Sequence, residues 1–116
     1  MLIPEFSVVG GAAQLTGDGI NEMERRKHDL EFQLCLCRRI LAREAILPFP
    51  FERAVVLLRK AGREEEELEL CNYVKSYCDN AEKPWDGWSA MIWKSPKLQK
   101  CVSRIEKLEK MATPPT

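Results

Sequence analysis

The fold is decided by residues 51–78, FERAVVLLRKAGREEEELELCNYVKSYC, where two stretches of helical periodicity meet at a glycine. Apolar side chains recur there at three- and four-residue steps, on Phe51, Ala54, Val55 and Leu58 and then on Leu70, Cys71, Val74 and Cys78. Gly62 supplies a stop, because glycine adopts the left-handed conformation that ends many helices. The acidic run 64–67 favours a helix start, where the macrodipole is positive. We therefore predict helices over 51–61 and from Glu64 to about Asp79.

A long helix is predicted upstream of this pair, from Glu22 to about Ala45. Asn21 followed by Glu24 has the pattern of a capping box, which satisfies the free amides of a first turn. One side of the helix carries an apolar stripe of Met23, Leu30, Leu34, Cys37 and Leu41. Pro48 and Pro50 end the helix, because proline lacks the amide hydrogen that a helix interior needs. At 1.5 Å per residue the helix would be about 36 Å long.

The two ends of the chain have different patterns. Residues 1–20 contain four glycines and no lasting periodicity, so we expect a flexible N-terminal arm. Residues 80–95 are aromatic but irregular. Residues 97–111 follow a capping Ser95 and carry an apolar stripe of Leu98, Cys101, Val102, Ile105 and Leu108. No segment alternates for long enough to predict a strand.

The expected fold is therefore all-α. It is a small four- to five-helix bundle with a long first helix and a central helical hairpin. Residues 21–112 would form a single helical domain, and residues 113–116 a disordered tail with two prolines.

Composition limits the possible functions. A chain of 116 residues with 45% hydrophobic and 31% charged residues has the profile of one folded domain. Eighteen basic and eighteen acidic residues give no net charge, whereas a dedicated nucleic-acid binder usually has a basic excess. The first residues lack the basic start of a signal peptide, and no apolar run has membrane-spanning length. With five cysteines and no export signal, we expect reduced thiols, a cytoplasmic location and no membrane partner.

Part of this pattern resembles a known helical repeat. Residues 51–63, FERAVVLLRKAGR, and residues 64–74, EEEELELCNYV, resemble a tetratricopeptide-type hairpin with the glycine at its turn. The segments ILPFPFER (residues 46–53) and SPKLQKCVSRIEKLEK (residues 95–110) extend the resemblance to a loose group of tetratricopeptide-like proteins. The resemblance covers roughly residues 40–110. Glu67 stands where such repeats place alanine, and a single repeat unit is recognisable. The resemblance implies a helical interaction module without naming its ligand.

The residues that could carry chemistry are scattered. Cys35 and Cys37 point to different sides of one helix, and Cys71 and Cys78 lie about 10.5 Å apart along theirs. Neither pair can clamp one metal ion, because zinc needs its ligands to converge. His28 is the only histidine and lies two helical turns from Cys35, which is too far for an activated nucleophile. We therefore expect no catalytic residue, no cofactor and no metal.

Glu67 is the one charged residue expected within an apolar helix face. A buried carboxylate requires a partner, because an unpaired charge is costly to remove from water. We expect Glu67 to lean toward the rim of the core and to pair with Arg53, Arg59 or Arg63.

The predicted long helix has a second apolar side. Phe32, Leu36 and Ile40 form a strip away from the main stripe, and Arg39 and Arg43 flank it. A helix that is apolar on two sides is either enclosed in a core or offered to a partner. Because the other elements are short, we predict that this side forms a homodimer or binds another protein.

Three tryptophans follow between the hairpin and the last helix. Trp85 and Trp88 are expected to fill the core, whereas Trp93 is expected to be exposed. Tryptophan and arginine contribute most to many interfaces. The predicted partner-binding residues are thus Phe32, Leu36, Arg39, Arg43 and Trp93.

Three functions stay open at this point. The first is a non-enzymatic protein-binding module: an adaptor, subunit or inhibitor that acts by occupying the surface of a protein partner. The second is a nucleic-acid-associated regulator that uses the basic residues of 25–27, 38–39 and 97–110, although acidic residues are interleaved with them. The third is a thiol-based redox or enzymatic role at Cys35, which would require a cysteine of unusual reactivity.

Overall fold

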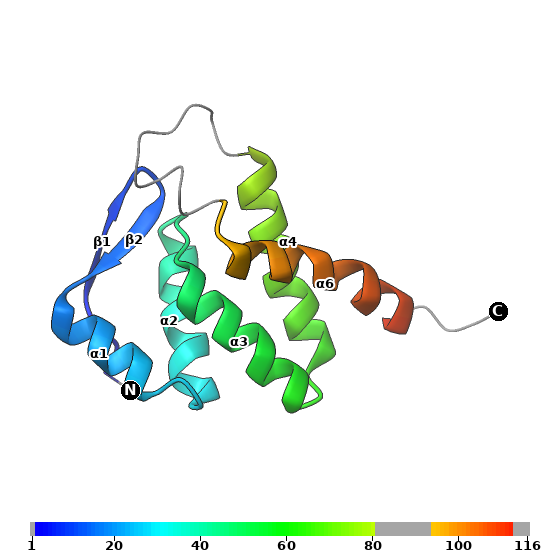
Figure 1. Cartoon of the computed structure of the whole chain (residues 1–116), viewed down its shortest axis with the longest axis horizontal. Coiled ribbons are helices and arrows are strands. Elements are labelled where there is room, and N and C mark those ends of the chain that lie inside the picture. Colours follow the sequence, from blue (N-terminus) through cyan, green and yellow to red (C-terminus); the bar gives the residue numbers. More distant parts are fainter. Residues whose placement is uncertain (1, 81–93, 113–116) are drawn as a thin grey trace.

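The computed structural model describes residues 2–80 and 94–112, and most of these residues are helical (Figure 1). In chain order the elements are β1 (Phe6–Val9), β2 (Ala12–Leu15), α1 (Gly17–Arg25), α2 (Leu30–Ala42), α3 (Pro48–Lys60), α4 (Glu64–Asn80) and α6 (Pro96–Ala112). The predicted all-α class is confirmed in outline, with the addition of a small two-stranded sheet. None of the described helices is long and apolar enough to cross a membrane.

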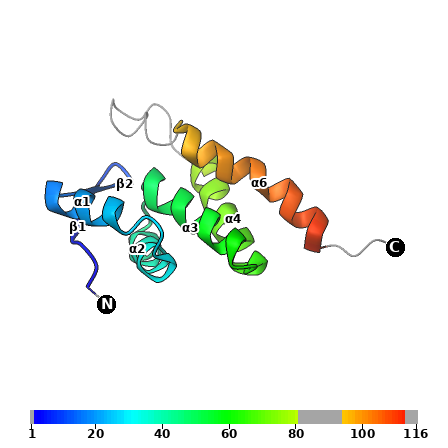
Figure 2. The ribbon, with the colours of Figure 1, turned by 60° about the horizontal axis from the view of Figure 1, so that its bottom comes forward.

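The elements follow one another across the molecule in chain order (Figure 2). The hairpin and α1 lie on one side of α2, and α3 and α4 lie on the other. The last helix, α6, packs against both α3 and α4. Helix α2 is therefore enclosed between two layers, and a helix in that position can bury apolar residues on both of its sides.

Residues 1–20, which we predicted to be a flexible arm, contain a β-hairpin. Strands β1 and β2 pair antiparallel, in a register that places Phe6 opposite Leu15. Gly10 and Gly11 connect the strands with φ angles of 58° and 79°. Two positive φ angles in a two-residue loop match the twist of the flanking strands, and glycine adopts them without steric cost. The prediction of a chain without strands is therefore wrong.

The hairpin is tied to the helical layers. Ala12 and Ala13 of β2 are fully buried. The amide of Ala13 donates to the Ile46 carbonyl at 2.9 Å, and the amide of Ile46 donates to the Gly11 carbonyl at 3.0 Å. The Tyr77 hydroxyl donates to the same Gly11 carbonyl at 2.8 Å. These bonds hold the hairpin against the segment before α3 and against α4.

The predicted long helix over 22–45 is divided into α1 and α2. Helix α1 is capped by Arg26, and α2 begins after Asp29, whose carboxylate accepts a backbone N–H at 3.1 Å. An aspartate in this position satisfies an otherwise free amide and so starts a new helix. Gln33 closes the joint, because its amide donates to the carbonyls of Met23 at 3.0 Å and Arg26 at 2.9 Å.

The start of α1 also differs from the prediction. Thr16 is its N-cap, and the Thr16 hydroxyl accepts the N–H of Gly19 at 3.2 Å. Asn21 and Glu24, the predicted capping box, lie inside α1 instead. The helix therefore begins five residues before the predicted Glu22, at Gly17.

The later helices lie close to their predicted positions. Helix α3 begins at Pro48 rather than Phe51, because Pro48 and Pro50 both fit the first turn, where no amide hydrogen is needed. Helices α4 and α6 begin within one residue of their predicted starts. Residues 81–93 and the predicted tail over 113–116 lie outside the described residues.

Two helix ends share one hydrogen-bond pattern. The bonded pairs are Glu44 with Leu41 and Ala45 with Ile40 after α2, and Gly62 with Arg59 and Arg63 with Leu58 after α3. Each set forms a Schellman motif, in which the first residue after the C-cap has a left-handed backbone conformation. Gly62 has a φ angle of 72°, which confirms the predicted stop, whereas the same position after α2 is held by Glu44 with a φ angle of 53°.

Candidate functional site

Two of the predicted contact residues lie in the core. Phe32 and Leu36 have no exposed surface, and Ile40 of the same strip has none either. The guanidinium of Arg26 lies 5.0 Å from the centre of the Phe32 ring, at the joint between α1 and α2. The hairpin and α1, which the sequence did not predict as a layer, lie beside α2 (Figure 2), and α3 packs against it. Phe32 and Leu36 are therefore unavailable to a partner, and this part of the prediction is wrong.

The predicted homodimer depended on the same strip. Because the strip is covered within one chain, the homodimer is left without the surface that motivated it and stays an untested prediction. Trp93, the remaining apolar contact residue, lies outside the described residues, as do Trp85 and Trp88.

Arg39 and Arg43 are exposed on α2, as the prediction requires. The structure brings them together in a groove of about 580 Å³ between α2 and the segment that leads into β1. We call this the arginine groove; its lining residues are Ile3, Pro4, Glu5, Phe6, Arg38, Arg39, Ala42 and Arg43. Three arginines and one glutamate give the groove a net charge of +2.

The three arginines of the groove differ in how they are held. Arg43 donates to the Phe6 carbonyl at 3.0 Å, and its guanidinium lies 5.3 Å from the centre of the Phe6 ring. Arg38 lies 3.5 Å from Glu66 of α4. Arg39 forms no ion pair within residues 2–80 and 94–112. Two arginines are thus anchored, and the third is free to bind an anionic group.

A second hollow continues from the arginine groove along α2. It has a volume of about 310 Å³, shares Arg38 with the groove and lies between α2 and α4. Its lining combines apolar surface of Leu34, Leu41, Leu70 and the ring of Tyr73 with the carboxylates of Glu66 and Glu69. The Tyr73 hydroxyl is occupied, because it donates to the Ala45 carbonyl at 2.8 Å, and burial raises the pKa of this tyrosine. The hollow therefore offers apolar surface next to a cationic groove, with two carboxylates at the α4 side.

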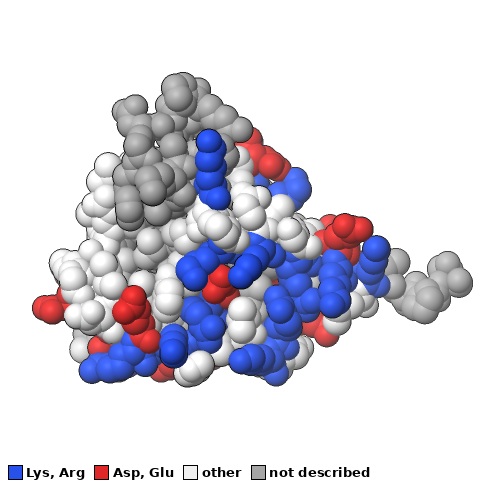
Figure 3. Space-filling view, in the orientation of Figure 1, with Lys and Arg blue, Asp and Glu red and all other residues white. Residues whose placement is uncertain are grey.

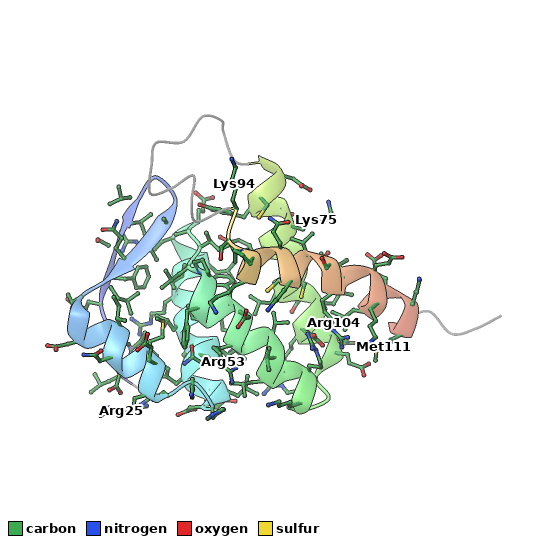
Figure 4. All side chains as sticks on the ribbon, in the orientation of Figure 1. Arg25, Arg53, Lys75, Lys94, Arg104 and Met111 are labelled. Carbon is green, nitrogen blue, oxygen red and sulfur yellow. The ribbon has the colours of Figure 1, made fainter. Side chains whose placement is uncertain are left out.

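A second charged surface lies over α3 and α6, where lysine and arginine side chains gather (Figure 3). We call it the basic face; it consists of Arg53, Arg59, Lys60, Lys97, Lys100, Arg104 and Lys107. Two carboxylates lie among these cations: Glu52, which is 3.8 Å from the Lys97 ammonium, and Glu67. Seven cations and two carboxylates leave a net charge of +5. Figure 4 shows Arg53 on α3 and Arg104 on α6.

The basic face arises because the charges of α6 are segregated. At roughly 100° per residue, Lys97, Lys100, Arg104 and Lys107 lie on one flank of the buried stripe, and Gln99, Glu106 and Glu109 lie on the other. The contacts agree with this division. Lys97 reaches Glu52 of α3, and Arg104 reaches Glu67 of α4, which also binds Arg59 of α3. Glu106 and Glu109 instead line a hollow with Asn72, Lys75 and Ser76 of α4. Residues that are interleaved in the sequence therefore separate in space.

Glu67 is fully buried at the inner edge of the basic face. Its Oε2 atom accepts from Arg104 Nε at 2.9 Å and from Arg59 Nε at 3.3 Å. Arg59 was one of three predicted partners; Arg63 instead binds Glu66, and Arg53 donates to the Lys27 carbonyl. The predicted position at the rim is wrong, because Arg104 from α6 closes over the carboxylate. The other oxygen, Oε1, is buried and has no partner among the described residues.

The cysteines do not form a common site. Cys37, Cys71 and Cys101 are buried, and burial raises the pKa of each thiol, to about 12 for Cys71 and Cys101. Cys35 is half-buried on α2. His28 lies near Arg53, 3.4 Å from its guanidinium, and no described hydrogen bond joins it to Cys35. Within the described ranges, no three His, Cys, Asp or Glu side chains are placed to hold a metal ion.

Two local patterns in the sequence correspond to features of the structure. The Gly10-Gly11 pair between short apolar segments is a hairpin pattern, which was not predicted. The basic residues of 97–110 were predicted as a possible nucleic-acid surface with interleaved acidic residues, but the steps of three, four and three residues from Lys97 to Lys107 place four cations on one flank of the helix. The arginine groove has no comparable pattern, because residues 3–6 and 38–43 meet only through the fold.

No protein-family model, no curated protein and no solved structure matches this chain. Similarity to known proteins therefore assigns neither a family nor a function. The two charged surfaces, with their residues and distances, carry what can be proposed.

Proposed function

We propose that this protein is a non-enzymatic protein-binding module whose arginine groove receives an acidic segment of a partner protein. One observation carries the proposal: Arg39 has no ion pair among the described residues and lies in a groove of net charge +2 with apolar walls. A carboxylate of the partner would pair with the Arg39 guanidinium, which can donate two parallel hydrogen bonds to it.

The neighbouring apolar surface favours a protein over a small anion. Ile3, Phe6 and Ala42 line the groove, and the hollow beyond Arg38 adds Leu41 and Tyr73. Interfaces between proteins combine an apolar centre with arginine and aromatic residues. The fitting occupant is a segment that alternates acidic and apolar side chains, with its acidic residues over Arg39.

The mechanism would be occupancy. A groove on a helix held between two layers changes little on binding, so a bound segment is sequestered or positioned without a chemical step. This suits an adaptor, a subunit or an inhibitor. We also propose the tetratricopeptide-like reading of α3 and α4 as the scaffold that holds α2, since α3 packs directly against it.

Selection from a random 16-residue peptide library displayed on phage tests the proposal with the full chain as target. We expect the selected peptides to be enriched in aspartate and glutamate between apolar residues. Arg39→Glu should weaken their binding at least about tenfold, which corresponds to 1.4 kcal/mol. Lys100→Glu makes the same charge change on the basic face, and we expect it to leave binding unchanged.

Two results would contradict the proposal. Selected peptides without an acidic bias would show that the groove does not recognise carboxylates. Acidic peptides that bind the Arg39→Glu and Lys100→Glu variants equally well would place their site elsewhere. Circular dichroism of both variants checks that the exchanged side chains, which are exposed, have left the helices intact.

A further inference from the structure

The basic face has properties that the arginine groove lacks. Its net charge of +5 belongs to a chain with no net charge, because the balancing acidic residues lie elsewhere, on α4 and on the far flank of α6. Seven cations against two carboxylates form a densely positive surface, which can attract a dense anion.

The cations are also arranged on rigid elements. Lys97 and Lys107 are ten residues apart on α6, which is about 15 Å at 1.5 Å per residue. One strand of a duplex places about four phosphates along that length, at 3.4 Å per phosphate. Arg53 and Lys60 add a second row on α3, which packs against α6.

Glu67 fixes two arginines within this surface. Arg59 and Arg104 both bind its Oε2 atom through Nε, at 3.3 Å and 2.9 Å. Bonding through Nε orients the guanidinium of Arg59, whose side chain is 46% exposed, and leaves its two terminal nitrogens outside this bond, whereas the side chain of Arg104 is only 11% exposed. Arginines held in this way lose less side-chain freedom on binding a phosphate than free ones would.

We infer that the basic face binds a nucleic-acid duplex through its phosphate backbone, without reading its sequence. The segregated charge and the length of the α6 row together support a duplex. Contacts that involve phosphates alone should be the same for every sequence.

Fluorescence anisotropy with a labelled 20-base-pair DNA duplex tests this inference. With five net charges engaged, the logarithm of the binding constant should fall with the logarithm of salt concentration at a slope of about −4 to −5, or −0.9 per phosphate. Lys100→Gln and Lys107→Gln should each weaken binding for all duplex sequences alike and reduce the slope by about 1. Arg39→Glu, outside the face, should leave the affinity within the scatter of the wild type.

Four results would overturn the inference. The first is no binding at low salt, and the second is a slope near zero. The third is an equal loss of binding in Arg39→Glu and Lys100→Gln. The fourth is displacement of the duplex by poly-glutamate at equal charge concentration, which would make the basic face a site for acidic protein. The peptide selection described above uses the other surface, so either proposal can fail without the other.

Discussion

Glu67 is the residue whose surroundings impose the strongest requirement on the fold. Its carboxylate is fully buried and shares one oxygen with Arg59 and Arg104, so it links α3, α4 and α6. A buried ion pair contributes little by itself, because desolvation offsets the attraction between the charges. Removal of one member is costly, because the other charge is left buried without a partner.

We therefore predict that Glu67→Ala lowers the free energy of unfolding by about 3–5 kcal/mol, measured by urea denaturation. The side chain of Arg104 is only 11% exposed, so its charge would be left uncompensated. Glu65→Ala, at an exposed position of the same helix, should change stability by less than about 0.5 kcal/mol. Equal effects of the two substitutions would mean that Glu67 is not buried in solution.

The buried thiols predict a loss of stability at alkaline pH. Burial raises the pKa of Cys71 and Cys101 from 9.0 to about 12 in the folded protein. Above pH 9 the unfolded chain releases these protons and the folded chain retains them. Their contribution is thus complete below pH 9 and is lost as pH rises toward 12.

Urea denaturation between pH 8 and pH 10.5 under reducing conditions measures this effect. Each thiol should contribute a slope of up to about 1.4 kcal/mol per pH unit in the upper part of the range. The Cys101→Ala variant should show a shallower decrease than the wild type, whatever its stability at pH 8. Parallel curves for the two proteins would contradict the assignment.

At the scale of elements, the end of one helix and the start of the next are set by single side chains. Asp29 caps α2 with a bond of 3.1 Å to a backbone N–H, whereas Asn21, the predicted cap, is an exposed residue within α1. We predict that Asp29→Ala destabilises the protein by about 1 kcal/mol. Asn21→Ala should have an effect below about 0.5 kcal/mol, because alanine favours a helix interior. Thermal unfolding compares the two, and the opposite order would restore the predicted long helix.

Substitutions at the left-handed positions of the two Schellman motifs should change the free energy of unfolding in opposite directions. Glu44 has a φ angle of 53°, which costs a non-glycine residue about 1–2 kcal/mol. Glu44→Gly should therefore raise the free energy of unfolding, by about 0.5–1 kcal/mol after the entropy of glycine is counted. Gly62→Ala should lower it by about 1 kcal/mol; an added Cβ there meets no atom within 4 Å, so the cost is conformational. A change of the same sign in both variants, measured by chemical denaturation, would exclude this reading.

Helical periodicity predicted α3, α4 and α6 well, because each has one buried face and clear ends. It did not predict the break between α1 and α2. Met23 and Leu30 are seven residues apart, so the apolar stripe stays in register across the joint and hides the cap at Asp29. The hairpin was missed because each strand is four residues long.

These two omissions explain the error at the candidate site. Without the hairpin and α1 as a layer, the second apolar side of α2 had no visible cover, so Phe32 and Leu36 were assigned to a partner. Arg39 and Arg43 were predicted correctly as exposed, because arginine is rarely buried without a partner. Their groove depends on residues 3–6, which no local pattern connects to α2.

At the scale of the whole molecule, a net charge of zero conceals two separate basic surfaces. The net charge is a sum over the whole chain. Binding depends instead on the charge within a Debye length of the surface, about 8 Å at physiological ionic strength. The arginine groove has a charge of +2 and apolar walls, and the basic face has a charge of +5. We propose a different partner for each surface, a protein segment for the groove and a phosphate backbone for the basic face.

The central claim is that the arginine groove binds an acidic protein segment. The most direct measurement is a titration of ¹⁵N-labelled full-length protein with a selected acidic peptide, followed by amide chemical shifts. We expect the largest shifts at Ile3, Phe6, Arg39 and Ala42, and Arg39→Glu should abolish them. Largest shifts on α6, or shifts that survive the substitution, would contradict it.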